Sequence, residues 1–374
     1  MVEWNPWSGC HPISEGCRHC PALEREENSP TVRQTKDFYL PIKRSRANGY
    51  RLTFLDNPVY VCTDSDFFLE EADRWRPAAW DVMHHRSDLQ FKIITRRIQR
   101  VQDCMPKNRV SIYDNVTVVC ACENQSTVEE RLPILSEIRA AHKEIWLEPL
   151  LEDISVEPYL ADSGIEAVTC GGETGNGARL CDYDWILHIR EQCLRHQVAF
   201  RFRKTGTLFR KDGRIYHLDR SLTTKQAQKA DIDYTPPTEE KESPYENVWK
   251  MLSQKYHRSI VLPPDMRRYC QREGWDKLRR QAYEIVRKNL SPAYIRDDSS
   301  QPPLKEHPVY FAQYAVAAVN RKMLWDWHEI PEGRKLKETE IIYIVELIME
   351  WLKREMEGKN PPFYETLQGN IITW

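Results

Sequence analysis

The sequence predicts an α/β fold: a partial (β/α) barrel followed by a second, mainly helical domain. From about residue 57, short β-branched or aromatic runs alternate with longer amphipathic runs, as repeated βα units around a parallel sheet do. After about residue 245, only the three- and four-residue spacing of helices remains. We therefore divide the chain into a barrel domain at 1–230, a polar, proline-containing linker at 231–245 and a helical domain at 246–374.

The barrel domain contains six predicted strands, each rich in β-branched, aromatic or cysteine residues: 59–62, 90–94, 116–122, 144–147, 166–170 and 198–202. The predicted helices of this domain are 66–85, 97–104, 126–142 and 183–196. Ser126 and Glu129 form a capping-box pattern at the start of the third helix. The helical domain is expected to hold helices at 248–255, 264–273, 275–288, 309–327 and 338–357.

Composition and charge argue against a membrane protein and against a generally basic nucleic-acid-binding protein. The 374 residues carry a formal net charge of −2. Such a charge does not attract nucleic acid to the molecule as a whole, so only a local basic patch could bind it. No apolar run is long enough to span a membrane, and the first residues lack a signal-peptide pattern, so we expect a cytoplasmic protein with no membrane partner. Eleven cysteines are then expected to be reduced thiols, and closely spaced ones to be metal ligands.

Three cysteines near the N-terminus form the main candidate metal site. Cys10, Cys17 and Cys20 have the spacing C-x₆-C-x₂-C in a loop that contains glycine and proline. Three thiolates hold a cubane iron–sulfur cluster with one iron left open. Zinc is the alternative, with His11 or His19 as a fourth ligand, and the spacing alone suits either metal.

Polar residues follow the predicted strands one after another, where the active sites of such barrels lie. They are Asp64, Thr95 with Arg96, Glu123, Glu148, Gly171-Gly172-Glu173 and Lys204. Each one taken singly also fits a helix cap or a solvated loop residue. Together they favour a site at the barrel mouth.

Residues 3–206 resemble an uncharacterised phage- and prophage-associated family of radical S-adenosylmethionine-like proteins. The resemblance rests on Trp4-Asn5-Pro6, Cys10, Gly16-Cys17, Cys20, Thr95-Arg96-Arg97, Glu123-Asn124-Gln125, Glu148-Pro149-Leu150-Leu151, Gly171-Gly172-Glu173, Ala178-Arg179 and Gln192-Cys193. It implies a barrel of the radical S-adenosylmethionine type with a [4Fe-4S] cluster on the three cysteines. It also implies S-adenosyl-L-methionine as cofactor, a 5′-deoxyadenosyl radical, and an electron donor such as flavodoxin or ferredoxin.

The resemblance also implies cofactor-binding residues. Gly171, Gly172 and Glu173 are similar to a glycine-glycine-glutamate element that contacts the methionyl amino group, although in this chain it follows a later strand. Glu123, Glu148 and Thr95 complete the expected cofactor-binding set, the two glutamates on ribose hydroxyls or on substrate. Two departures stand out. Pro21 replaces the tyrosine usual after the third cysteine. The first cysteine gap exceeds the C-x₃-C-x₂-C spacing commonest in radical S-adenosylmethionine enzymes, but the resembling family shares this longer gap.

Residues 246–357 resemble a second family of unknown function. The matching segments are Arg279-Arg280-Gln281-Ala282, Leu290-Ser291-Pro292-Ala293, His307-Pro308-Val309, Ala312-Gln313, Arg321 and Trp327 to Arg334. That family carries three cysteines where this chain has Val319, Asn320 and Met323, so we expect no metal site there. His307 and His328 are then either contacts for a substrate or partner, or packed histidines.

Three hypotheses for the function follow. The first is a radical S-adenosylmethionine enzyme of unknown substrate. The phage association suggests nucleic acid or a nucleotide as the substrate class. Trp325 and Trp327, near basic residues, fit either base stacking or, as is more usual for such a pair, core anchors with a solvated basic rim. The second is a non-catalytic protein with a structural zinc site. The third is a barrel hydrolase that uses Glu123, Glu148 or Glu173 as an acid/base pair.

Overall fold

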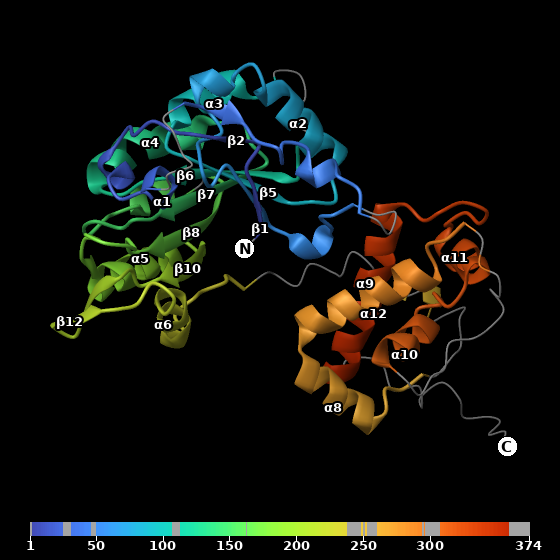
Figure 1. The fold of residues 1–374 in the computed structure, drawn as a ribbon. Helices are drawn as coiled ribbons and strands as arrows, with labels where there is room; N and C mark the ends of the chain where they lie inside the picture. The colour runs from blue at the N-terminus through green and yellow to red at the C-terminus, as the bar shows by residue number, and fades with distance from the viewer. Residues whose placement is uncertain are drawn as a thin grey trace. The chain divides into compact units, whose positions relative to one another are not determined.

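The chain forms two compact units, residues 1–238 and 239–374, and each is described by itself (Figure 1). The computed structural model describes residues 2–24, 31–45, 50–106, 113–161, 163–237, 248–249, 251–252, 260–293, 295 and 307–358. The division between the units falls inside the predicted linker 231–245. Residues 238–245 of that linker lie outside the described residues, as do residues 250 and 253–255 of the predicted helix 248–255.

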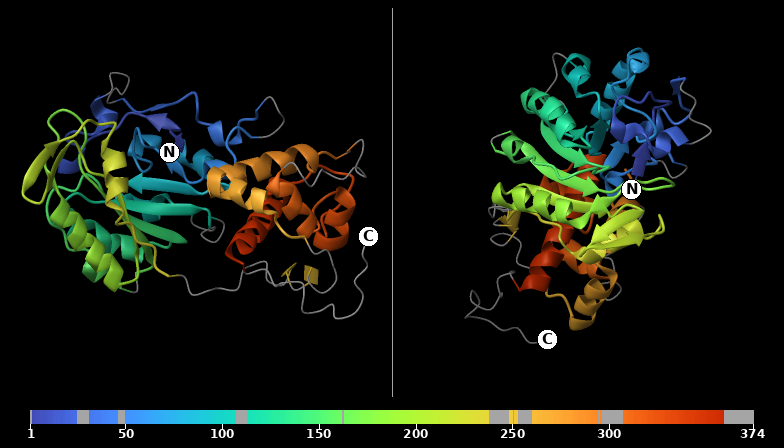
Figure 2. Two further views of the ribbon diagram at one scale, coloured as in Figure 1. Left: turned by 90° about the horizontal axis from the view of Figure 1, so that it is seen from below. Right: turned by 90° about the vertical axis from the view of Figure 1, so that its left-hand side faces the viewer.

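The first unit is an α/β structure around a curled, seven-stranded parallel sheet that forms a half-barrel (Figures 1 and 2). In spatial order the strands are β1 (Val2–Trp4), β4 (Val59–Val61), β5 (Phe91–Thr95), β6 (Val116–Ala121), β7 (His142–Leu147), β8 (Ile165–Gly171) and β10 (Ala199–Lys204). The six strands from β4 onward confirm the six predicted ones to within two residues. Strand β1, which pairs with β4 from Val2 opposite Val59, was not predicted.

Side chains alternate strictly between the two faces of this sheet. One face is apolar and belongs to the hydrophobic core, with Val59, Val61, Phe91, Ile93, Val118, Cys120, Ile145, Leu147, Val168, Cys170, Phe200 and Phe202. The opposite face carries polar and aromatic side chains, including Tyr60, Lys92, Glu144, Trp146 and Arg203. Parallel sheets are usually apolar on both faces, so the polar face marks the side on which a ligand is expected.

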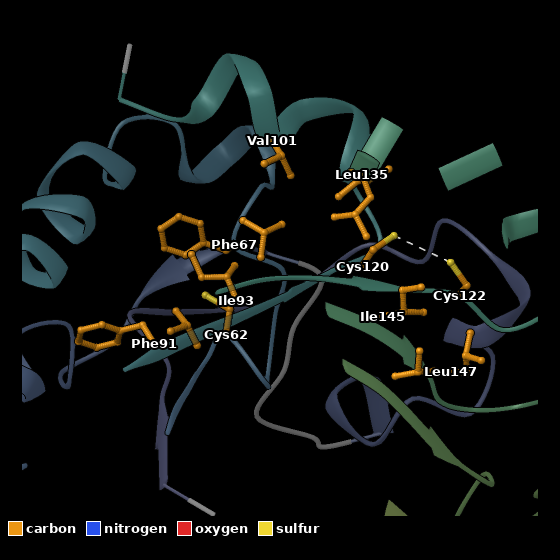
Figure 3. Close-up of a cluster of buried hydrophobic side chains, with 14 of the residues drawn as sticks. Cys62, Phe67, Phe91, Ile93, Val101, Cys120, Cys122, Leu135, Ile145 and Leu147 are labelled. Atoms are coloured by element: carbon orange, nitrogen blue, oxygen red, sulfur yellow. Dashed lines mark hydrogen bonds between the residues drawn. The ribbon is translucent and has the colours of Figure 1, made fainter. Parts of the chain in front are cut away.

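Four helices pack on the apolar face: α2 (Arg76–His85), α3 (Ile98–Cys104), α4 (Gln125–Glu137) and α5 (Tyr183–Arg195). Figure 3 shows Val101 of α3 and Leu135 of α4 pointing toward the strand residues Ile93, Cys120 and Ile145. Helix α2 begins ten residues later than the predicted helix 66–85, whose first part is a loop with a short 3₁₀ turn, Glu70–Ala72.

The predicted capping box of α4 is wrong. The cap is Asn124, whose side chain accepts a hydrogen bond from the Thr127 amide at 2.9 Å, and Ser126 already lies in the first turn. Asparagine is as good an N-cap as serine, and the extended backbone of Asn124 leaves its side chain free to reach back to the helix.

Small elements complete this unit. A second sheet has the order β12 (Arg214–His217), β11 (Leu208–Lys211) and β9 (Cys181–Asp182), and β2 (Trp7–Ser8) pairs with β3 (Arg33–Gln34). Short helices α1 (Pro21–Glu24) and α6 (Thr223–Ala230) follow the cysteine loop and the β11–β12 hairpin. Beyond α6, Tyr234 exchanges two backbone hydrogen bonds with Phe200, at 2.8 and 2.9 Å.

The second unit is helical, with α8 (Pro264–Glu273), α9 (Trp275–Asn289), α10 (Pro308–Ala315), α11 (Arg321–His328) and α12 (Glu338–Glu357). These confirm the predicted helices 264–273, 275–288 and 338–357. The single predicted helix 309–327 is wrong: it is broken into α10 and α11. Ala317 has a φ of 53°, and Asn320 starts a new helix by accepting a hydrogen bond from the Met323 amide at 2.8 Å.

None of the helices in the described part of the chain is both long and apolar enough to cross a bilayer.

Candidate functional site

A cavity of about 380 Å³ opens at the carboxyl ends of the half-barrel strands. Such a volume lies within the usual range for small-molecule sites, roughly 300–1,000 Å³. The three predicted metal ligands, Cys10, Cys17 and Cys20, all line it. So do residues from the ends of β4, β5, β7, β8 and β10: Cys62, Asp64, Asp66, Arg96, Arg97, Trp146, Glu148, Gly172, Glu173, Arg203 and Lys204.

The segment before the cysteines is fixed to the sheet by its aromatic and amide side chains. Trp4 and Trp7 are fully buried, and their ring N–H groups donate to the carbonyl oxygens of Phe38 and Asp66 at 3.0 and 3.1 Å. The Asn5 carboxamide oxygen accepts from the Asp64 amide at 3.1 Å, just after β4. The Trp-Asn-Pro element therefore places the cysteine loop over the strand ends.

The cysteine loop itself is held by groups from four strand ends. The Gly16 amide donates to Glu123 Oε1 at 3.1 Å, after β6, and the Arg179 Nη2 group donates to the Glu15 carbonyl at 3.1 Å, after β8. After β5, the Arg97 Nη2 group donates to the His11 carbonyl at 2.7 Å. After β4, the Ser65 hydroxyl donates to the Gly9 carbonyl at 2.5 Å. Side chains that follow four strands of the sheet therefore hold the loop in place.

Glu123 is a loop anchor in this structure. Its side chain has no exposure to solvent, it does not line the cavity, and Oε2 accepts from Arg131 Nη1 at 3.1 Å. Arg96 Nε lies 3.7 Å from the same oxygen. A Cβ on Gly16 would lie 2.9 Å from the Glu123 carboxyl carbon, so glycine is needed next to Cys17. The predicted contact of Glu123 with ribose or substrate stays a prediction, and this geometry gives it no direct support.

Two arginines set the electrostatics around the three thiols. Arg97 Nη1 lies 3.9 Å from Cys10 Sγ. Burial and the nearby Asp66 carboxylate raise the pKa of Cys10 to about 11, against the lowering effect of Arg97. Burial by itself would lower the pKa of the Arg96 guanidinium, but Cys17, Glu123 and Cys20 outweigh it and raise this pKa. A cation that interacts with both Cys17 and Cys20 favours anionic sulfur ligands at this place.

The three thiols are free, and all three line the cavity. Across the described ranges, no group of three or more His, Cys, Asp or Glu side chains is arranged to hold a single metal ion. Three cysteine thiolates are the protein donor set of a cubane cluster with one open iron, and they also supply three of the four ligands of a structural zinc ion. Of the two zinc-ligand histidines considered, His11 Nε2 lies 2.7 Å from Glu71, and His19 lines the cavity.

Glu148 is the central carboxylate of the cavity wall. It forms two hydrogen bonds with Arg203, at 2.6 and 2.7 Å, one ion pair with Lys204 at 2.6 Å, and accepts from the Trp146 ring N–H at 3.1 Å. Burial would raise the pKa of Glu148, but Lys204 and Arg203 outweigh it and lower this pKa to about 2. Glu148 is therefore charged at neutral pH.

The Gly171-Gly172-Glu173 element lies where β8 meets β10. A Cβ on Gly172 would lie 2.3 Å from the Thr205 carbonyl oxygen, and one on Gly171 would lie 2.7 Å from Glu148 Oε2. Glycine is therefore required by close backbone packing at Gly172. The Glu173 carboxylate is bound by Arg179 at 2.7 and 3.0 Å, and this arginine lowers the pKa of Glu173 despite its burial.

The predicted site residues fall into two layers. Cys10, Cys17, Cys20, Glu148, Gly172 and Glu173 line the cavity, whereas Glu123, Thr95 and Gly171 support it from behind. Thr95 donates to Asp66 at 2.8 Å and accepts from the Arg97 amide at 2.9 Å. Trp146 and Arg220 also line the cavity and were missed. Glu144, Trp146 and Glu148 follow each other at a two-residue spacing, which indicates one shared face of β7.

In the helical unit, three of the residues singled out from the sequence, His307, Arg321 and His328, contact backbone groups, whereas Trp325 is 52% exposed. His328 binds the Val316 carbonyl at 2.8 Å and the Tyr343 hydroxyl at 3.0 Å. His307 caps α10 by accepting from the Val309 amide at 3.2 Å, and Arg321 donates to the carbonyls of Leu290 and Pro331 at 3.0 and 2.5 Å. This supports the expectation of packed histidines.

Both parts of the chain match known protein families. Residues 2–276 match the family model described as "Protein of unknown function (DUF5131)". Residues 246–353 match a second model, "Domain of unknown function (DUF4186)", and the two matches overlap over 246–276. No solved structure matches the chain. Because the first match covers well over half of its length, the chain belongs to the DUF5131 family, and its C-terminal part is similar to DUF4186.

Proposed function

We propose that this protein is a radical S-adenosylmethionine enzyme in which Cys10, Cys17 and Cys20 hold a [4Fe-4S] cluster. One observation carries the proposal: the three cysteines line the same cavity as the carboxyl ends of the half-barrel strands. In open parallel sheets ligands bind at that edge, so cluster, cofactor and substrate would share one chamber. When bound and reduced by an external electron donor, the cluster would supply one electron that breaks the C5′–S bond of S-adenosylmethionine and gives methionine and a 5′-deoxyadenosyl radical.

The residues of the chain have separate tasks in this proposal. The loop anchors Glu123, Arg179 and Ser65 keep the cysteines in place, and Arg96 and Arg97 offset the negative charge of the thiolates. The cavity wall would present Asp64 and the Arg179-bound Glu173 to a cofactor's ammonium and hydroxyl groups. It would present Arg203 and Lys204, which share the one carboxylate of Glu148, to the cofactor's carboxylate. The three thiols are shielded from bulk water, with Cys17 buried and Cys10 and Cys20 partly buried.

The hydrolase alternative receives no support from the carboxylates. An acid/base pair needs one carboxylic acid that keeps its proton near neutral pH. The pKa values of Glu148 and Glu173 are both lowered, because Lys204 and Arg203 surround the first and Arg179 binds the second. Glu123 is fully buried and already paired with Arg131.

Metal analysis of anaerobically reconstituted protein tests the proposal. We expect about four irons and four sulfides per chain, with an electron paramagnetic resonance signal after dithionite reduction that changes when S-adenosylmethionine is added. Cys17→Ala should lose the signal. The matched controls are Cys270→Ala, a buried cysteine of the helical unit, and Cys62→Ala, a cysteine in the cavity wall that the proposal leaves out of the ligand set.

Both controls should keep the iron content and the signal. One zinc per chain with no iron after reconstitution would replace the proposal by the structural zinc site. Loss of iron in Cys62→Ala as complete as in Cys17→Ala would show that the ligand set is different.

A further inference from the structure

Positive charge is concentrated in one segment next to the cavity. Residues 199–230 contain nine Lys and Arg against two Asp, a net charge of +7, although the whole chain carries −2. The segment comprises β10, the β11–β12 hairpin and α6. A polyanion would therefore be drawn to this part of the barrel unit and not to the molecule in general.

Part of this charge is already neutralised inside the protein. Arg203 and Lys204 bind Glu148, and Arg210 binds Asp182. The cations that remain exposed to solvent are Lys211, Arg214, Arg220, Lys225 and Lys229. Among the described residues, the side chains of the last four have no hydrogen-bond or ion-pair partner. They are therefore available for an external anion.

The exposed cations continue into the cavity. Helix α6 is joined to the end of β10, where the Thr205 amide donates to the Thr223 carbonyl at 3.3 Å. In Figure 1 the β11–β12 hairpin projects beside α6 at the β10 side of the sheet. Arg220, between hairpin and helix, lines the cavity together with Arg203 and Lys204. A ligand on the hairpin could therefore reach the cavity through Arg220, next to Arg203 and Lys204, which share the single carboxylate of Glu148.

The same surface exposes large apolar side chains. Ile215, Tyr216 and Leu222 are 55, 42 and 42% exposed, although β12 pairs with β11 along its length. An aromatic ring among unpaired cations is the combination that binds single-stranded nucleic acid, where bases stack and phosphates meet Lys and Arg.

We propose that the β11–β12 hairpin and α6 bind single-stranded nucleic acid and lead it into the cavity. Arg214, Arg220, Lys225 and Lys229 would contact phosphates, and Tyr216 would stack on a base. A folded acidic protein also fits the charge, but it could not follow the cations into a cavity of about 380 Å³. Single-stranded nucleic acid would then be the substrate class of the proposed enzyme. Its binding to the hairpin and α6 does not itself require the cluster.

The test is fluorescence anisotropy of the full chain with a labelled oligothymidylate of about 20 nucleotides, at several salt concentrations. Replacing Arg214, Arg220, Lys225 and Lys229 by alanine should weaken binding by about 100-fold. It should also reduce the salt slope by about 3, since each phosphate contact contributes roughly 0.7 for single strands. Lysine at positions 214 and 220 should retain binding, and Tyr216→Ala should weaken it about tenfold.

A matched control replaces four exposed cations of the helical unit, Arg268, Arg280, Lys288 and Lys322, by alanine. It removes the same charge and should change affinity less than twofold. Equal losses in both variants, tighter binding of duplex than of single strand, or equal competition by polyglutamate would each overturn the proposal. Replacing Cys10, Cys17 and Cys20 by alanine should leave oligonucleotide binding intact, which separates this proposal from that of the cluster.

Discussion

Buried and half-buried polar side chains serve different purposes in the two units. In the barrel unit, Glu123 and Arg179 bind the backbone of the cysteine loop and so position three thiols around a cavity. In the helical unit, Arg321 and His328 bind backbone carbonyls between helices and thereby fix the chain between α9 and α12. A buried polar network therefore indicates a functional site only when it converges on reactive groups that a ligand can reach.

The largest effect is expected from removing Glu123, the anchor of the cysteine loop. Glu123→Ala removes the acceptor of the Gly16 amide and leaves Arg131 and Arg96 without their buried partner, which costs about 3–5 kcal/mol in the free energy of unfolding. Iron binding on reconstitution should fall as well. Urea denaturation and iron analysis measure both, with the exposed Glu137→Ala as the control. An unchanged iron content would mean that the loop keeps its place without Glu123.

A smaller effect is expected from Arg321→Ala in the helical unit. Loss of its two buried hydrogen bonds to Leu290 and Pro331 should destabilise that unit by about 2–3 kcal/mol. Hydrogen exchange should then be faster in α11 and α12, while iron binding stays at the wild-type level. A drop in iron content comparable to that of Glu123→Ala would contradict the division of roles between the two units.

Glu148→Gln should lower the free energy of unfolding by about 2 kcal/mol at pH 7, because Arg203 and Lys204 lose a charged partner but keep some access to water. The pKa of Glu148 lies below its unfolded value, so its stabilising effect is present above that value and disappears as the pH falls toward 2. Unfolding curves of wild type and variant should therefore converge between about pH 4.5 and pH 2. A constant difference over this interval would show that the ion pairs are not responsible.

The smallest effect concerns His328. Burial lowers its pKa, so below the ordinary value near 6.5 the unfolded chain binds a proton that the folded unit rejects. The stability of the helical unit should fall by about 1 kcal/mol as the pH decreases from 7.5 to 5.5. His328→Gln should flatten this dependence when thermal unfolding is followed by circular dichroism. An equally steep pH dependence in the variant would assign the titration to another group.

The six strands from β4 onward were predictable because each is a short run rich in β-branched, aromatic or cysteine residues, and longer amphipathic runs lie between them. Strand β1 was not, since only its pairing with β4, almost sixty residues away, defines it. Nor was β12, whose four residues are all exposed and show no alternation. At the site, the cysteines and strand-end carboxylates were predictable from their positions. Their roles depend on Arg131 and Arg179, and the sequence alone does not reveal such pairings.

The contact of Tyr234 with Phe200 protects the open edge of the half-barrel. Strand β10 ends the sheet, and an exposed edge strand offers free N–H and C=O groups to other chains. The two hydrogen bonds of Tyr234 occupy part of that edge, and the Arg201 guanidinium also binds the Tyr234 carbonyl at 2.7 Å. The chain thus protects its own boundary against strand addition and aggregation, without closing the barrel over the cavity.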